Sequence, residues 1–508
     1  MNTQFFSDIY LKFTHLYAQN MVQEEDEPRV PEKVIRCVWN DQLLNTEDLR
    51  TTDGKFLEVV FPGYWNFGSG PDFKSAAIKV DGVLLEGDVE LHVYGTDWKS
   101  HGHSRNNDFD NVILHVFLWK GRGKAATGKR LSRPHIFDLE LKSYLRRGVL
   151  QLNEELDFDS YPVLNPFNYG LCHEPLARLT EVKFLELLNA AGDARIQTKM
   201  DRFHDRIITH GYEQTFYEGV AEAMGYPSNK TAFKTLAEKL PLATLKAHVP
   251  ARASAQDKAL VMQALLFGVS GLIDFAALKT STLSAAAKTY FSQLEKIWKK
   301  HEAELGHLSL ERKDWKFGRM RPANFPYRRI AGLSHLVVRH WQNGIFGDYL
   351  NSIKSIVSKD EEKAYTAASL KKTVQFFCLE VDDHWASHYT PGGKQLKKQQ
   401  KLVGPDRSRE ITINIGIPIG LIYARASKSV PLERALGRLF HTKSAPADNQ
   451  WLRFMKHYIL GNKDRMWKLL KSDQQTQGLM QVYQDYCTKN ENNCLRCQFP
   501  KVVDQYFS

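Results

Sequence analysis

Three side chains that could do chemistry alternate along residues 84–93, which read LLEGDVELHV. Alternate side chains of a β-strand share a face, so Asp88, Glu90 and His92 are predicted to point one way and the apolar residues between them the other. Two carboxylates and an imidazole on one face indicate a functional site. The alternative is an antiparallel strand whose polar face is solvated.

A fourth candidate, Asp72, stands at the exit of a glycine-bearing turn, Gly63–Asp72. Such a turn could aim its carboxylate at the polar face of the neighbouring strand. Asp72 and Glu90 together would suit Mg²⁺ or Mn²⁺, because these hard ions take carboxylate and water oxygens. An ion held there could activate a water and stabilise a phosphorane-like transition state. The alternative for Asp72 alone is a turn or helix-capping aspartate.

Histidines form a second possible centre in the same region. His101 and His103 follow His92 closely, and His115 comes soon after them. The His-X-His spacing can chelate Zn²⁺ or another borderline metal, so His92, His101 and His103 with a carboxylate would suit a metallohydrolase of a small molecule. The alternative is a hydrogen-bonded loop with solvated histidines. We expect His115 to occupy a core or edge position instead.

The acidic residues also resemble the motif of the PD-(D/E)XK nuclease superfamily, in which Pro-Asp enters one strand and Glu-X-Lys lies on the next. Pro71-Asp72 and Glu90-Leu91-His92 match in order and spacing, and a predicted helix (Glu32–Leu44) and strand (Phe56–Phe61) precede them. The resemblance implies a restriction-endonuclease-like fold with Asp72 and Glu90 as metal ligands. His92 replaces the lysine, and a neutral imidazole could be a base, a ligand or neither.

Nearly the whole chain is also similar to an uncharacterised bacterial family of about 500 residues, known only as a domain of unknown function. That similarity implies a shared architecture and no activity. The residues that carry it are Pro62-Gly63, Asn66, Gly70-Pro71-Asp72-Phe73, Gly87–His92, Asp97-Trp98, His101-Gly102-His103, Val112–Val116 and the C-terminal cysteines.

The hydrophobic pattern predicts an α+β protein of two domains. Residues 1–165 are expected to form a restriction-endonuclease-like α/β domain with a small mixed sheet, and residues 166–508 a mostly α-helical domain. The further predicted strands are Ala76–Val80, Leu84–Tyr94, Val112–Trp119 and Ile136–Leu141. The predicted helices of the second domain include Glu181–Ala191, Gln197–His210, Gln214–Met224, Leu260–Leu278, Ala285–His301 and Leu432–Phe440.

The charge balance favours a polyanionic partner, nucleic acid first, because the 508 residues carry a formal net charge of +11. Two basic segments could contact phosphates, although a solvated charge run is the alternative for each. The candidate nucleic-acid-binding residues are Lys394, Lys397, Lys398, Lys401, Arg407, Arg409, Arg321, Arg328 and Arg329.

Three C-terminal cysteines, Cys487, Cys494 and Cys497, have the spacing Cys-X₆-Cys-X₂-Cys. This spacing resembles most of the iron–sulfur motif of helix-hairpin-helix DNA glycosylases, but Val503 stands where the fourth cysteine would be. Cys172 or its neighbouring histidine could complete a Zn²⁺ or iron–sulfur site. Thiols without a ligand are the alternative.

The N-terminal residues lack the pattern of a signal peptide, and the most apolar stretch is interrupted by polar residues. We therefore expect a cytoplasmic protein with no membrane partner. Three functions stay open. The first is a divalent-metal-dependent nuclease acting on DNA or RNA, with Asp88 or His92 assisting Asp72 and Glu90. The second is an inactive member of its family that binds nucleic acid or protein. The third is the histidine-rich metallohydrolase.

Overall fold

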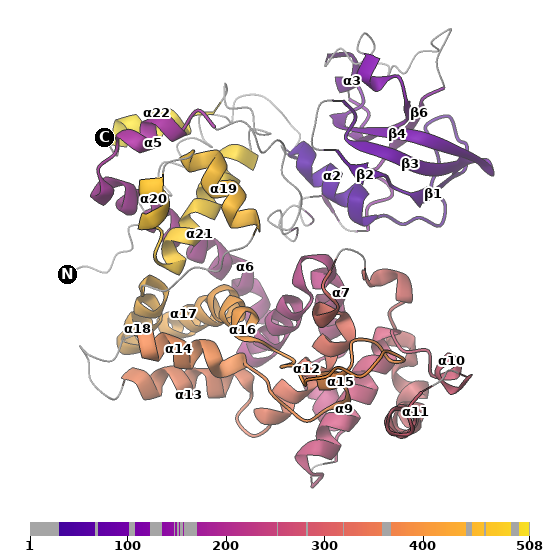
Figure 1. Cartoon of the computed structure of the whole chain (residues 1–508), viewed down its shortest axis with the longest axis vertical. Helices are drawn as coiled ribbons and strands as arrows, with labels where there is room; N and C mark the ends of the chain where they lie inside the picture. Colours follow the sequence, from indigo (N-terminus) through magenta and orange to yellow (C-terminus); the bar gives the residue numbers. More distant parts are fainter. Residues whose placement is uncertain are drawn as a thin grey trace. The chain divides into compact units, whose positions relative to one another are not determined.

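The computed structural model divides the chain into two compact units, each of which is described by itself (Figure 1). Unit 1 comprises Met1–Ala191, Asp448–Leu470 and Gln477–Ser508, and unit 2 comprises Gly192–Ala447 and Lys471–Thr476. The structure describes residues 30–66, 70–100, 107–121, 135–146, 148–149, 152, 156, 170–250, 252–280, 283–317, 320–357, 367–442, 450–461, 464–488 and 497–506. The predicted domain boundary at residue 165 lies outside these residues.

Unit 1 contains a mixed β-sheet whose strands run in the order β1-β3-β4-β5-β6, with the short β2 paired to β3. The pairs β1–β3 and β3–β4 are antiparallel, whereas β4–β5 and β5–β6 are parallel. The elements are α2(Glu32–Asp41), β1(Leu57–Phe61), β2(Tyr64–Trp65), β3(Phe73–Val80), β4(Val83–Tyr94), α3(Asp97–Ser100), η2(Asn107–Phe109), β5(Val112–Trp119) and β6(Phe137–Glu140).

Burial explains why these segments form a sheet. β5, of sequence VILHVFLW, is buried at every position but its last, as expected for a parallel strand covered on both faces. Helix α2 lies against the sheet (Figure 1) and buries Val34, Val38 and Trp39 in the same hydrophobic cluster as the strands. The indole N–H of Trp39 donates to the carbonyl of Pro62 (2.9 Å), which fixes the helix beside the turn that leads to Asp72.

The remaining described elements of unit 1 are helices, and α5 contacts both α19 and α22. These elements are α5(His173–Arg178), the first part of α6(Glu181–Met224), α19(Gln450–Leu460), α20(Asp464–Leu469), most of α21(Asp473–Val482), the π-helix η9(Tyr483–Thr488) and α22(Phe499–Tyr506).

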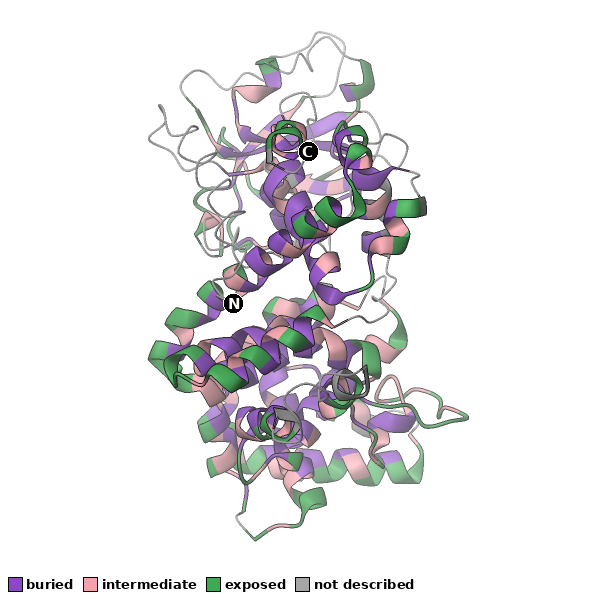
Figure 2. Cartoon of the chain, turned by 90° about the vertical axis from the view of Figure 1, so that its left-hand side faces the viewer, coloured by how far each residue is buried: buried purple, intermediate pink, exposed green. Residues whose placement is uncertain are grey.

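Unit 2 is helical, and many of its helices carry buried residues along one side and exposed residues along the other (Figure 2). Its elements, after the remainder of α6, are α7(Tyr226–Lys239), α8(Leu242–Ala247), α9(Ala255–Ser270), α10(Phe275–Thr280), α11(Ala285–Leu305), η4(Gly306–Leu308), η5(Arg312–Asp314), η6(Pro322–Asn324), α12(Pro326–Arg339), α13(Ile345–Val357), α14(Ala367–Val374), η7(Gln375–Phe377), α15(His384–Ser387), α16(Pro405–Ile411), η8(Thr412–Gly416), α17(Ile417–Ala426) and α18(Val430–His441).

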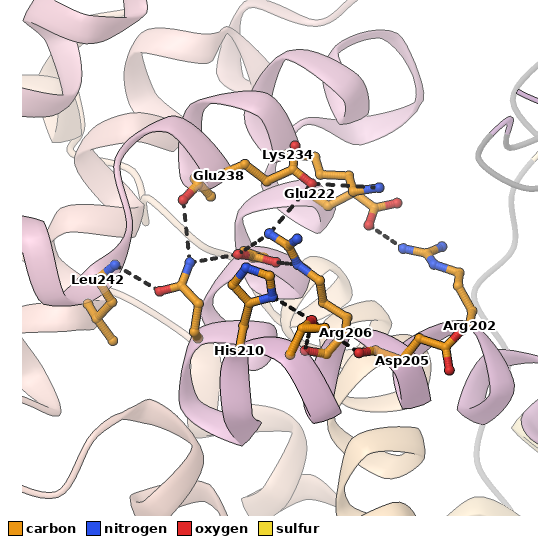
Figure 3. Close-up of polar contacts among 12 residues, drawn as sticks. Arg202, Asp205, Arg206, His210, Glu222, Lys234, Glu238 and Leu242 are labelled. Carbon is orange, nitrogen blue, oxygen red and sulfur yellow. Dashed lines mark hydrogen bonds and ion pairs between the residues drawn. The ribbon is translucent and has the colours of Figure 1, made fainter. Parts of the chain in front are cut away.

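Helix α6 changes direction at Gly211, whose φ of 78° is a conformation that favours glycine. An ion-pair network joins the segments on either side of the bend (Figure 3). Arg206 binds the carboxylate of Glu218 through two nitrogens (2.6 and 2.7 Å), and Arg202 binds Glu222. Gln214 donates to Glu218 (2.6 Å), so the bend is held by charge-assisted hydrogen bonds.

The coarse fold prediction is confirmed, since the protein is mixed α and β with a sheet in its N-terminal part and helices in most of the remainder. The single helix predicted over Leu260–Leu278 is wrong. Gly271 ends α9 in the left-handed region (φ 61°), and a Cβ there would lie 2.1 Å from the carbonyl oxygen of Leu310. None of the described helices is both long and apolar enough to cross a membrane.

Two stacked histidines lie on and just after the short helix α15 in unit 2. The ring of His384 is parallel to that of His388, with centroids 4.1 Å apart, and it also stacks on Tyr290. Nε2 of His384 is buried and has no hydrogen-bond partner among the described residues. Burial, followed by the nearby His388, lowers the pKa of His384 to about 4.

This depressed pKa predicts acid destabilisation. Between pH 6.5 and about 4, His384 takes up a proton in the unfolded chain but not in the folded protein. The free energy of unfolding should therefore decrease by up to about 3 kcal/mol as the pH is lowered through this range. His384→Phe should flatten that dependence in urea unfolding measured from pH 7 to 4. His204→Phe is the control because the His204 side chain is 60% exposed. Parallel pH profiles for His384→Phe and wild type would contradict the assignment.

Candidate active site

Asp72 and Glu90 meet across the antiparallel pair β3–β4. Phe73 pairs with Val89, which places Asp72 opposite Glu90. The main-chain N–H of Asp72 donates to Oε2 of Glu90 (2.9 Å), and the N–H of Leu91 donates to Oδ2 of Asp72 (3.1 Å). The residues are 6% and 5% exposed, so both carboxylates lie inside the protein and are bound by main-chain donors.

The turn before Asp72 is fixed by its own hydrogen bonds. The side chain of Asn66 donates to the carbonyl of Pro71 (2.8 Å), and its main-chain N–H donates to the carbonyl of Asp72 (2.7 Å). Gly63 has a φ of 96°, and a Cβ there would lie 3.0 Å from the Cβ of Phe73. Glycine is therefore needed where the chain turns towards Asp72.

Arg36 supplies the positive charge that the carboxylates require. It projects from α2, and its Nη2 lies 2.8 Å from Oδ1 of Asp72 while it also binds Glu32. Burial by itself would lower the pKa of Arg36, but the charges of Asp72, Glu32 and Glu90 outweigh burial and raise the pKa above its usual value. The sequence analysis missed this residue. Its signal was an arginine set among the buried apolar residues of a predicted helix.

Arg36 offsets the cost of the buried acids only in part. Burial first, and the neighbouring charge of Asp72 second, raise the pKa of Glu90 well above its ordinary value. Arg36 opposes that rise only in part. Among the described residues, Asp72, Glu90 and Glu32 lie together around the guanidinium of Arg36, and such a cluster of acids favours uptake of a proton or a cation.

A row of polar side chains extends from Glu90 across three strands, and hydrogen bonds join His92, His115 and Asp138 within it. Nε2 of His92 lies 3.7 Å from Oε1 of Glu90, and Nδ1 of His92 lies 2.9 Å from Nε2 of His115. Nδ1 of His115 lies 2.9 Å from Oδ1 of Asp138. His115 lies on β5 and Asp138 on β6, and the two residues are partners in the parallel pairing of these strands.

The partners assign the protons along this chain when both rings are neutral. An ionised Asp138 only accepts, so His115 carries its proton on Nδ1 and its Nε2 accepts from Nδ1–H of His92. In this tautomer Nε2 of His92 carries no proton, and it lies 3.7 Å from Oε1 of Glu90. The chain thus presents a basic nitrogen at the carboxylate pair.

This polar face is buried, so the alternative of a solvated face is wrong. His92 is 1% exposed and His115 is fully buried, as expected for a core position. The ring of Trp98 lies 5.1 Å from His115 and 6.4 Å from His92, centroid to centroid. Trp98 therefore gives the two histidine rings an apolar neighbour.

Asp88 lies beside a bulge in β3. Its Oδ1 accepts from the main-chain N–H of Ser75 (3.0 Å), whose φ is 57°. The β3–β4 register shifts between Phe73 and Ala76, at this same place. Asp88 thus stabilises a left-handed residue three positions after Asp72, which helps to orient the carboxylate of Asp72.

The predicted zinc ligands His101 and His103 lie outside the described residues, so the histidine-rich alternative stays a prediction. The same holds for Cys494, while Cys487 is buried in η9 and Cys497 is half-buried. Within the described part of the chain, no three His, Cys, Asp or Glu side chains form a metal-binding group.

The basic candidates of unit 2 divide into buried and exposed residues. Arg328, Arg329 and Arg407 are 1%, 5% and 8% exposed and donate to main-chain carbonyls. Arg409 binds Asp473 through two nitrogens. The exposed candidates are Arg321, Lys394, Lys397, Lys398 and Lys401.

Fold and site together define a mixed α/β protein with a buried carboxylate–imidazole centre in its sheet. Residues 32–449 match the family described as "Protein of unknown function (DUF2851)", and the chain belongs to this family. The predicted membership of an uncharacterised family is thereby confirmed. No curated protein and no solved structure matches the chain.

The hydrogen-bonded histidines predict a defined tautomer for His92. In ¹⁵N-histidine NMR of the wild-type protein, assigned with a His92 variant, we expect Nδ1 of His92 to be protonated and Nε2 to be bare. His115→Phe removes the acceptor of that proton, so the tautomer of His92 with the proton on Nε2 should become more populated. The free energy of unfolding should decrease by about 1–3 kcal/mol. A proton on Nε2 of His92 in the wild-type protein would contradict the assigned chain.

Proposed function

We propose that the protein is a divalent-metal-dependent nuclease of the PD-(D/E)XK type. The observation that carries the proposal is the contact of Asp72 with Glu90 at the junction of β3 and β4. The order of elements supports it: a helix is followed by antiparallel strands, and β5 then pairs parallel to the strand that bears Glu90. The resemblance requires a helix and a strand before Asp72, and α2 and β1 occupy these places.

The donor set fits Mg²⁺ or Mn²⁺. Both ions are hard, and Mg²⁺ is commonly held by one or two carboxylates with water completing the shell, so a third protein ligand is not required. The closeness of two buried carboxylates also favours a cation beside Asp72 and Glu90. These two residues would hold the ion, which when bound lowers the pKa of a water and neutralises developing charge on phosphate.

The protein's own residues would do the remaining work. His92, whose Nε2 lies 3.7 Å from Oε1 of Glu90, would take a proton from an attacking water. His115 and Asp138 would hold that ring in the required tautomer as positioning residues. Arg36 would keep one oxygen of Asp72 in a fixed direction, and Asp88 would maintain the bulge beside it.

The substrate class follows from chemistry and charge. Carboxylates that hold a divalent ion suit phosphodiester hydrolysis, and a net charge of +11 favours a polyanionic substrate. DNA or RNA is therefore the proposed substrate.

One observation favours a second candidate, a nucleic-acid- or protein-binding protein without catalysis. The ion pair between Arg36 and Asp72 already satisfies one carboxylate oxygen without a metal. Such a protein would bind nucleic acid equally well in EDTA and would turn nothing over.

The test is cleavage of single- and double-stranded DNA and RNA by the full chain in Mg²⁺, Mn²⁺ or EDTA. We expect metal-dependent cleavage, and Asp72→Asn or Glu90→Gln should reduce its rate more than about 100-fold because each removes a metal ligand. Asn and Gln retain an oxygen that accepts the main-chain hydrogen bonds, and circular dichroism should show folded variants. Asp48→Asn is the matched control, since the Asp48 side chain is 70% exposed.

Two outcomes would contradict the nuclease. Cleavage unchanged in both variants would remove Asp72 and Glu90 from the mechanism. No cleavage by the wild-type chain in either metal, with binding intact in EDTA, would favour the binding protein.

A further inference from the structure

A long irregular segment in unit 2 carries lysines and no acids. Residues 388–401, called the basic loop, read HYTPGGKQLKKQQK and contain four lysines but no Asp or Glu. The segment contains no helix or strand, and Lys394, Lys397, Lys398 and Lys401 are all exposed. Irregular loops of this length inside compact domains are uncommon and are usually functional.

Arg328 forms hydrogen bonds with the main chain at both ends of the basic loop. Its Nη1 donates to the carbonyls of Trp385 and His388, and its Nη2 donates to the carbonyls of Gln400 (3.2 Å) and Lys401 (3.1 Å). The guanidinium is buried in α12, so one fixed side chain closes the loop at its base. Burying a guanidinium is costly, and these carbonyls offset the cost.

Arg329 joins a second basic segment to the same place. It donates to the carbonyl of Leu402 and also to the carbonyl of Ala323 (3.0 Å), in the turn that follows Arg321. Helices α12 and α15, which hold the two parts, contact one another (Figure 1). The basic loop and the segment that follows Arg321 are therefore held together by hydrogen bonds of the buried Arg328 and Arg329. Arg321 and the lysines of the basic loop are exposed.

The exposed lysines are not used to hold the fold together. Within the described part of the chain, no carboxylate lies within ion-pair distance of Lys394, Lys397 or Lys398, whereas Lys401 pairs with Glu380 (3.0 Å) at the surface. Several uncompensated positive charges on a pinned loop cost free energy through mutual repulsion, and a polyanion would relieve it. A loop ordered beforehand also loses little entropy on binding.

We propose that the basic loop and Arg321 form a surface that binds the phosphate backbone of nucleic acid. Lysines on a flexible stem bind phosphate as point charges, so the surface positions a strand without reading its sequence. This inference goes beyond the proposed nuclease, because the surface lies in unit 2 and would act whether or not the sheet site cuts.

The test is fluorescence anisotropy of a labelled DNA or RNA oligonucleotide with the full chain in EDTA, across a salt series. Replacing Lys394, Lys397 and Lys398 together by Gln removes three charges from exposed positions. The slope of log K against log salt should become shallower by about 2–3, and affinity at low salt should fall more than about tenfold. The matched control replaces the exposed Lys296, Lys299 and Lys300 of α11 by Gln, with the same change of net charge.

Unchanged binding by the loop variant would overturn the proposal, as would an equal loss in the α11 control. Loss of binding to phosphatidylserine vesicles with unchanged binding to the oligonucleotide would overturn it in favour of a membrane surface. Because the assay contains EDTA, it gives the same answer in a Glu90→Gln background. A failure of the nuclease proposal and a failure of this one are therefore distinguishable.

Discussion

The antiparallel contact between β3 and β4 forces two carboxylates together inside the sheet, and the structure around them follows from that constraint. Asp72 and Glu90 each accept a main-chain N–H from the opposite strand, so their separation is set by the ladder rather than by flexible side chains. Buried like charges at such a contact need compensation. Arg36 provides part of it, and this explains an arginine on the buried face of α2.

The same constraint gives a reason for the polar chain behind Glu90. A histidine buried two residues along the strand needs a partner for each ring nitrogen. His115, on the next strand, is the partner of Nδ1 of His92, and Asp138, on the strand after that, is the partner of Nδ1 of His115. The parallel half of the sheet thus carries a row of polar groups through an otherwise apolar core, which would be costly if it served packing alone.

Sequence patterns were sufficient for most strands of the sheet and for the residues that share one strand. Val112–Trp119 was predicted with its observed bounds, and Asp88, Glu90 and His92 were assigned to one strand because alternation is local. The patterns could not supply Arg36 or Asp138, whose roles depend on contacts between distant segments. Asp138 did leave a signal, since it alternates with the buried Phe137 and Leu139.

Unit 2 shows the same difficulty in another form. Arg321, Arg328 and Arg329 were grouped as one basic patch because they are close in sequence, yet helix α12 turns two of them inward to bind carbonyls. Only the fold separates arginines that hold the structure from charges that are available to a partner.

Mn²⁺ binding measured by isothermal titration calorimetry tests the central claim, a cation site made by Asp72 and Glu90, most directly. Saturable binding by the wild-type chain that is lost in Glu90→Gln, with that variant still folded, is the result we predict. Absence of binding, or equal binding by the wild type and Glu90→Gln, would contradict the claim.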